Sequence, residues 1–296
     1  DYRYLSTQQI RQLFFPSLRS AQMRLQILKD LHLLYSWKVI QTPGVIRRPS
    51  LIVLSPRGAR VVAGWRGHDE HAYAVRAREA REHCYHAHHD LEANGFFVDL
   101  AAATRDIPDH GLLMWWGEEH MRRLREATAK KHRWPAPTPD GRATLITPAG
   151  RVELELEWDR GTESLSRVAA KVAAYVGFYK NFRNAEASNV LFALPTHVRE
   201  LDVRHTIWRS RARWASDVCC TFWTTTHRCL RDYGPLAAVW LRVDLRSSDP
   251  PDQDILARLR SRLSVLNVSD ANDRSPRDCI GKPRWWDRRP GGGQAA

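Results

Sequence analysis

The sequence predicts an α/β protein (α+β overall) of two parts: a small N-terminal winged helix-turn-helix and a larger α/β domain, whose mixed sheet is flanked by helices. Three observations support this. Residues 1–66 show the order helix, helix, β-hairpin, helix. From Asp140 onward, strands alternate with helices, which is typical of a sheet covered by helices. Finally, 296 residues with 43% hydrophobic content suit two compact units and exclude wholesale disorder.

The first module, residues 1–66, contains two helices in succession. Ser6 or Thr7 is expected to cap the first helix, which Pro16 ends because proline lacks the amide that a helix interior needs. Ser20 is expected to cap the second. The apolar face of this second helix is predicted to consist of Met23, Leu25, Ile27, Leu28, Leu31 and Leu34.

A β-hairpin and a third helix complete the module. Extended segments are predicted at 37–40 and 51–54, with a turn at Pro43-Gly44 between them. Serine followed by proline is a helix start signal, so Ser55-Pro56 begins a helix that runs to Val62.

The polar face of the second helix is the first candidate functional site. A helix in the major groove needs donors that reach bases and phosphates, and arginine, glutamine and lysine supply them. We therefore predict DNA contacts from this helix, supported by basic residues of the hairpin and the third helix. The candidates are Gln22, Arg24, Gln26, Lys29, Arg47, Arg48 and Arg57. The alternatives are an ordinary solvated helix face, or a module that contacts protein only.

The rest of the chain divides into three segments. Residues 67–88 form a linker or a solvated helix, 89–246 form the α/β domain, and 247–296 form a basic, largely disordered tail. A run of possible metal ligands lies at the end of this linker and the start of the α/β domain: His83, Cys84, His86, His88 and His89. Imidazole and thiol groups suit zinc, but the spacing matches no closed zinc motif, so a solvated run is the favoured interpretation.

The α/β domain is expected to contain four helices and six strands. Helices are predicted at 90–105, 118–131, 163–182 and 196–213, and strands at 112–116, 143–147, 152–158, 190–194, 218–223 and 236–243.

Acidic residues gather at two adjoining strands of this domain. Asp140 precedes one strand, and Glu155, Glu157 and Asp159 alternate along the next, so that all three are expected on one face. Carboxylates at adjoining strand ends make an oxygen-rich site of the kind that Mg²⁺ accepts, with Asp140 and Glu157 as ligands. Lys171 in the following helix could stabilise charge while the ion activates water. The alternative is an edge strand whose acidic stripe faces solvent.

The formal net charge is +13, which attracts polyanions such as double-stranded DNA. A general bias toward basic composition is the alternative. The odd number of five cysteines argues for reduced thiols and hence for the cytoplasm. No stretch is as long and apolar as a membrane span, so we expect no membrane partner.

Several blocks together resemble the replication-relaxation family of plasmids and integrative elements. They are Leu5-Ser6-Thr7-Gln8-Gln9-Ile10, Arg24-Leu25-Gln26-Ile27-Leu28, Leu54-Ser55-Pro56-Arg57-Gly58-Ala59, Pro139-Asp140, Glu157-Trp158-Asp159-Arg160-Gly161-Thr162-Glu163-Ser164, Lys171 with Tyr175, and Gly234-Pro235-Leu236-Ala237-Ala238-Val239-Trp240. The likeness covers residues 4 to about 243, and its acidic block is its most specific part.

This resemblance implies a second domain similar to the PD-(D/E)xK, or restriction-endonuclease-like, nuclease fold. Asp140 and Glu157 would occupy the acidic positions. The third position should be lysine but is Asp159, so Lys171 would have to substitute for it. The family also implies a role in plasmid replication, relaxation of DNA or mobilisation, with the element's replication or conjugation machinery as partners.

Three functional hypotheses follow. The first is a DNA-binding accessory or initiator protein without catalysis of its own. The second is a metal-dependent DNA nickase or endonuclease that uses Asp140, Glu157, Asp159 and Lys171. The third is a transcriptional regulator whose second domain forms a homodimer.

Overall fold

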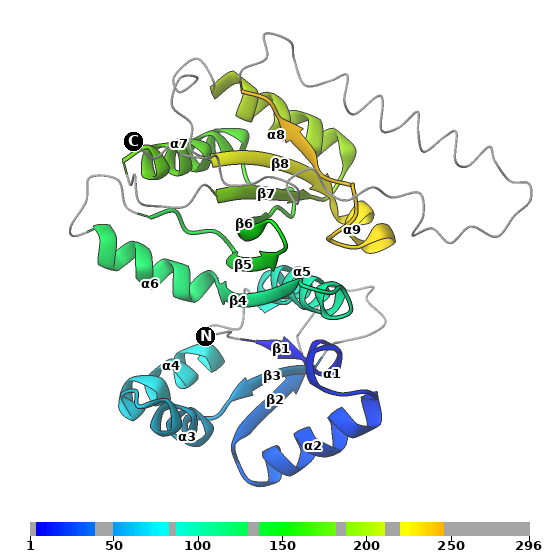
Figure 1. The fold of residues 1–296 in the computed structure, drawn as a ribbon. Coiled ribbons are helices and arrows are strands. Elements are labelled where there is room, and N and C mark those ends of the chain that lie inside the picture. Colours follow the sequence, from blue (N-terminus) through cyan, green and yellow to red (C-terminus); the bar gives the residue numbers. More distant parts are fainter. Residues whose placement is uncertain are drawn as a thin grey trace, which may run out of the picture. The chain divides into compact units, whose positions relative to one another are not determined.

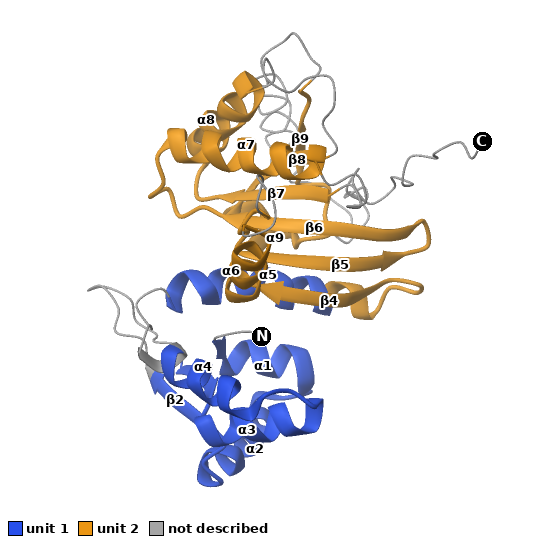
Figure 2. Cartoon of the chain, turned by 90° about the vertical axis from the view of Figure 1, so that its left-hand side faces the viewer, with its two compact units in different colours: residues 1–102 blue, residues 103–296 orange. Residues whose placement is uncertain are grey.

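The structure, a computed structural model, describes residues 4–38, 50–82, 87–129, 136–181, 188–210 and 220–245. The chain is a mixed α/β protein (Figure 1) that divides into two compact units, residues 1–102 and 103–296 (Figure 2). Each unit has a sheet of its own. Helix α5 begins in the first unit and ends in the second. Arg47 and Arg48, and the predicted tail from 247 to 296, lie outside the described residues.

Within its described residues, the first unit combines a three-stranded antiparallel sheet, in the order β1-β3-β2, with five helices. Its elements are β1 (Leu5–Ser6), α1 (Thr7–Phe14), α2 (Leu18–Asp30), β2 (Leu34–Lys38), β3 (Ser50–Leu54), α3 (Pro56–Arg66), α4 (Glu70–Glu82) and α5 (Ala87–Arg105). The first hairpin strand thus begins three residues before the predicted 37–40. The segment predicted as a linker or solvated helix contains α4.

Local capping interactions set the helix starts of this unit. Ser6 and Gln9 form a reciprocal capping box at α1. The predicted cap of α2 at Ser20 is wrong, because the helix begins one turn earlier: Ser17 is the cap and accepts a hydrogen bond from the Ser20 amide at 3.1 Å. Ser55 caps α3 as predicted and accepts from the Gly58 amide at 2.9 Å.

Helix α2 buries a narrower stripe than its sequence predicts. Ala21 and Leu25, one turn apart, are buried. Met23, Ile27 and Leu31 were expected on the same apolar face, but they are 60%, 48% and 51% exposed. Met23 is two positions from Ala21 and from Leu25, about 200° around the helix, so the side that packs inward cannot also bury Met23.

The second unit is built on a six-stranded mixed sheet in the order β4-β5-β6-β7-β8-β9. Strands β6, β7 and β8 are parallel, and the other neighbours are antiparallel. Its elements are β4 (Gly111–Gly117), α6 (Glu118–Ala129), β5 (Gly141–Thr147), β6 (Gly150–Trp158), α7 (Leu165–Asn181), β7 (Ser188–Leu194), α8 (His197–Arg209), β8 (Cys220–Thr226), α9 (His227–Tyr233) and β9 (Leu241–Val243). The predicted alternation of strands and helices is confirmed.

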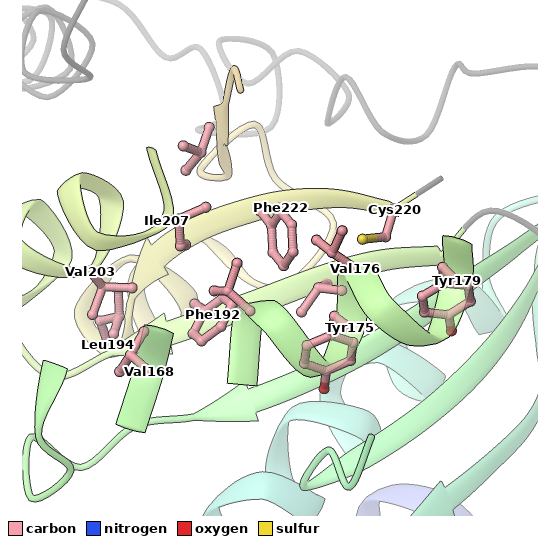
Figure 3. Packing of buried hydrophobic residues seen from close by; sticks show 13 residues of the cluster. Val168, Tyr175, Val176, Tyr179, Phe192, Leu194, Val203, Ile207, Cys220 and Phe222 are labelled. Carbon is pink, nitrogen blue, oxygen red and sulfur yellow. The ribbon is translucent and has the colours of Figure 1, made fainter. Parts of the chain in front are cut away.

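A hydrophobic core joins α7 and α8 to one face of the parallel strands. Alternate residues of β7 and β8, among them Phe192 and Phe222, belong to one buried cluster with Tyr175 and Val176 of α7 (Figure 3). Most of the intervening residues, such as Leu191, Ala193 and Trp223, are buried too, which accounts for the nearly continuous apolar run in β7.

The predicted strand at 236–243 is too long. Only Leu241–Val243 pairs with β8, because residues 234–240 turn instead. Within this turn, Trp240 Nε1 donates to the Pro235 carbonyl at 2.9 Å. The short helix α9, capped by Thr226, was not predicted. In the described parts of the chain, no helix combines the length and the apolar content needed to cross a membrane.

Candidate functional site

The carboxyl end of β6 lies beside the start of β5, because these two strands are antiparallel. Asp140 immediately precedes β5, and its backbone amide donates to the Leu156 carbonyl at 2.9 Å. Its carboxylate Oδ2 accepts from the Trp158 amide at 2.6 Å. The side chain of Asp140 is therefore fixed to the end of β6, as the predicted meeting of adjoining strand ends requires.

Glu157 is the buried centre of this site, with 2% of its surface exposed. Its Oε2 lies 2.7 Å from Lys171 Nζ, and its Oε1 accepts a hydrogen bond from the Tyr175 hydroxyl at 2.6 Å. Lys171 Nζ also lies 2.9 Å from Glu163 Oε2. Helix α7 thus supplies a cation and a hydroxyl donor to a carboxylate of β6.

Asp140, Glu157 and Lys171 lie close enough for their charges to influence one another. Burial raises the pKa of Glu157 to about 7; the Lys171 charge opposes this rise, and the Asp140 charge adds to it. Burial alone would lower the pKa of Lys171, but the charges of Glu157 and Asp140 raise it above its ordinary value. Three of the four predicted catalytic residues therefore interact with one another.

Asp159, the fourth predicted catalytic residue, has different hydrogen-bond partners from the other three. Strand β6 ends at Trp158, so the alternation that relates Glu155 to Glu157 stops before Asp159. The carboxylate of Asp159 accepts from Arg199 Nε at 2.7 Å and from the Gly161 amide at 2.5 Å. Arg199 also donates to the Glu163 carbonyl at 2.7 Å. Asp159 thus connects the end of β6 to the first turn of α8.

The row of acids continues backward along β6. Glu155, 1% exposed, accepts from the Tyr179 hydroxyl at 2.8 Å, and burial raises its pKa to about 7 against the opposing charge of Arg142. Glu153 lies 3.1 Å from an Arg142 nitrogen and accepts from Thr144 at 2.7 Å. Because these carboxylates are buried, the alternative of a solvent-facing acidic stripe is wrong.

Sequence reasoning missed several partners of these acids. Tyr175 was noted only within the family resemblance; it is fully buried, and its hydroxyl binds Glu157. Tyr175 and Tyr179 are four residues apart on α7, and Figure 3 shows both hydroxyl groups pointing the same way. Four residues along a helix and two residues along a strand both span about 6 Å, so each tyrosine can reach one of Glu155 and Glu157. This matched spacing is the sequence signal that could have revealed the pairing. Arg142 and Arg199 carried no comparable pattern.

The predicted DNA-binding residues of the first unit are mostly exposed. Gln22, Arg24 and Gln26 of α2 and Arg57 of α3 are exposed, and Lys29 is half-buried. Around the helix, however, Arg24 lies about 160° from Gln26, so these residues do not form a single face.

The histidine run is only partly visible. His88 and His89 lie in α5, whereas His83, Cys84 and His86 lie outside the described residues. The prediction of a solvated run therefore remains a prediction.

Comparison with known proteins decides the family. Residues 1–193 match the replication-relaxation family, and this match covers well over half of the chain. The protein belongs to the replication-relaxation family. No curated protein and no solved structure matches the chain. Family membership connects this replication-relaxation protein with DNA and its replication.

The acidic block that resembles the family has a physical basis in the structure. Glu157 and Glu163 both bind Lys171, while Asp159 binds Arg199 and the Gly161 amide. Gly161 has φ +80°, a conformation that favours glycine. In this replication-relaxation protein, the ion pairs and hydrogen bonds of the block thus fix the carboxyl end of β6 to α7 and α8.

Proposed function

We propose that this replication-relaxation protein binds duplex DNA through its first unit, acting as a winged helix, in the replication, relaxation or mobilisation of a plasmid or integrative element. The observation that carries the proposal is the exposed polar surface of α2. The buried residues of this helix are Ala21 and Leu25, so most of its surface is open to a partner. The element's replication or conjugation machinery would be its partner.

The order of elements supports this role. Helices α1 and α2 are separated by three residues, which suits a helix-turn-helix, and α2 is followed directly by the strand pair β2 and β3 and then by α3. In such modules the second helix enters the major groove with its N-terminal residues toward the bases, while neighbouring elements contact the backbone.

Charge supports the same conclusion. Helices α1, α2 and α3 contain seven basic residues and a single acidic one, Asp30. The basic residues are Arg11, Arg19, Arg24, Lys29, Arg57, Arg60 and Arg66. Such a surplus favours phosphate contacts, whose counterion release makes binding weaken steeply with salt.

The test is fluorescence anisotropy of the full chain with labelled duplexes from the element's own origin region and with scrambled duplexes of equal length. We expect tighter binding to the origin duplex, weakened by Gln22→Ala with Gln26→Ala. The matched control is Arg228→Ala, an exposed arginine of the second unit. Equal affinity for all duplexes would overturn the sequence-specific role, and an absence of binding would overturn the proposal altogether.

A second candidate function is metal-dependent cleavage of a phosphodiester, favoured by the coupling of Asp140, Glu157 and Lys171. The two carboxylates are hard oxygen donors that would hold Mg²⁺. Each oxygen of Glu157 already accepts one hydrogen bond, from Lys171 or Tyr175, and keeps a second lone-pair position. A bound ion would polarise the phosphodiester and activate water. Lys171, in place of the missing motif lysine at Asp159, would stabilise developing negative charge.

Supercoiled plasmid with Mg²⁺ or Mn²⁺ tests this candidate. We expect conversion to open circle that Asp140→Asn and Glu157→Gln abolish, and that the exposed-residue control Asp232→Asn leaves unchanged. An absence of open circles with the wild-type chain would remove the catalytic candidate while leaving DNA binding intact.

A further inference from the structure

The outward side of α2 carries apolar side chains among polar ones. Arg19, Gln22, Met23, Gln26 and Ile27 are all exposed, and we call them the recognition stripe. Their spacing of three and four residues places them on one face of the helix. Met23 and Ile27, at 60% and 48% exposure, form an apolar centre that the packing of the first unit leaves uncovered.

We infer that the recognition stripe reads A·T base pairs in the major groove, with Met23 and Ile27 against the C5 methyl groups of thymine. Thymine is the base that presents a methyl group in this groove, and apolar side chains recognise it. Gln22 and Gln26, on the same face, have the amide geometry that suits adenine. This inference rests on the proposed binding of duplex DNA and names what α2 selects.

The contacts of Gln26 support a base-reading role. Its Nε2 donates to Asp30 Oδ1, one helical turn later, at 2.8 Å. An amide nitrogen has two N–H donors, so the second donor and the carbonyl oxygen remain for a base. This hydrogen bond also restricts the side chain before DNA arrives, which lowers the entropic cost of binding. Arg24, on a different side of the helix, is assigned to the phosphate backbone.

A second copy of this chain could also cover an apolar stripe. The charge around the stripe favours DNA over that alternative. A symmetric contact through α2 would bring the same surface of two copies together, including Arg19 of each. With seven basic residues and one acidic residue on α1, α2 and α3, such a contact would set like charges against each other. A polyanion with methyl groups in its groove matches both the cationic surroundings and the apolar centre.

The experiment begins with selection of the tightest-binding duplexes from a random-sequence pool by the full-length protein. The selected duplexes are then resynthesised with deoxyuridine in place of thymidine, which removes the C5 methyl and keeps every hydrogen-bonding group. We expect enrichment of A·T pairs and a loss of affinity of about fourfold per contacted methyl, from the free energy of burying one such group.

Variants assign this effect to the stripe. Met23→Ala with Ile27→Ala should bind the thymidine and deoxyuridine duplexes equally. Val61→Ala, which trims an exposed apolar residue of α3, should keep the wild-type preference. Circular dichroism of each variant confirms that it is folded.

The outcomes separate the two proposals. If the protein retains no duplex at all, DNA binding itself fails. If it retains duplexes without enriching any sequence, DNA binding stands, and the sequence-specific role and the methyl-reading inference are both overturned. If duplexes are enriched but bind equally well with deoxyuridine, DNA binding stands and the methyl-reading inference is overturned. If the double alanine variant instead converts a dimer to a monomer in sedimentation and leaves the methyl preference unchanged, the stripe is a self-association surface and the inference is likewise overturned.

Discussion

Lys171 Nζ lies 2.7 Å from Glu157 Oε2, and this ion pair holds helix α7 against the carboxyl end of β6. The pair is unequally buried, since the Glu157 side chain is 3% exposed and that of Lys171 is 27% exposed. Lys171 has a second carboxylate partner, Glu163, and is partly solvated. The loss of this ion pair should therefore cost Glu157 more than it costs Lys171.

Removal of the cation tests this dependence. Lys171→Met should destabilise the second unit by about 3 kcal/mol, because the buried Glu157 would lose its cation and would have to stay as an unpaired charge or take up a proton. Combining it with Glu157→Gln should recover part of the loss, because the glutamine is neutral. Hydrogen exchange of the α7 amides measures the effect locally, with Lys180→Met at the exposed end of the same helix as control. Equal protection in the wild type and Lys171→Met would contradict the prediction.

The buried acids predict a pH dependence of stability. The pKa values of Glu155 and Glu157 are raised from 4.5 to about 7, so the folded chain binds more protons than the unfolded chain between these values. Their stabilising contribution is present below about pH 4.5 and is lost as the pH rises through about 7. His120 has the opposite effect on the pH dependence of stability. Burial lowers its pKa, so its contribution to stability increases with pH.

Comparison of wild type with Glu155→Gln separates these contributions. The melting temperature should fall less steeply between about pH 5 and 7 in the variant than in the wild type, because the variant has one acid fewer to deprotonate. Differential scanning calorimetry at constant ionic strength gives the two slopes. Identical slopes would show that Glu155 titrates normally.

The left-handed backbone of Gly161 gives a third prediction. Gly161→Ala should destabilise the chain by about 1–2 kcal/mol, the cost of this conformation for an L-residue. The added Cβ would also lie 3.3 Å from Pro195 Cγ. Gly111→Ala is the matched control, since a Cβ there meets nothing within 4 Å and its φ is ordinary. Thermal unfolding of both variants compares them, and equal losses would argue against strain at residue 161.

Arg57, exposed in the first turn of α3, tests the backbone contacts of the proposed DNA complex. Arg57→Ala should weaken binding to all duplexes alike and reduce the slope of log affinity against log salt by about 0.9, the value for one lost phosphate contact. Anisotropy titrations over a salt series provide the slope. A loss confined to one DNA sequence would instead assign Arg57 to a base.

Much of the second unit could be predicted because its local signals agree with its packing. The strand-helix alternation from Asp140 onward and the meeting of Asp140 with the end of β6 both follow from the strand pattern. The direction of Asp159 could not be predicted, because it depends on where β6 ends and on Arg199, forty residues later. Tertiary hydrogen bonds of this range leave no periodic signal in the sequence.

Helix α2 shows the same limit in the first unit. Its existence was predictable, but the predicted helix began one turn too late and reached Leu34, which lies in β2. Its apolar residues also lie on more than one side. Only the packed structure selects Ala21 and Leu25 as the buried pair and leaves Met23 and Ile27 outside. The sequence therefore indicated a polar DNA-contacting face and gave no indication that its centre is apolar.

The tyrosines of α7 carry a consequence for how the second unit assembles. Glu155 and Glu157 leave water when β6 enters the sheet, and their hydroxyl donors Tyr179 and Tyr175 arrive only with α7. A sheet that formed before the helix docked would enclose two carboxyl groups without these donors, at a substantial cost in desolvation. We therefore expect strand β6 and helix α7 to form together, as a single cooperative step, although six residues separate them along the chain.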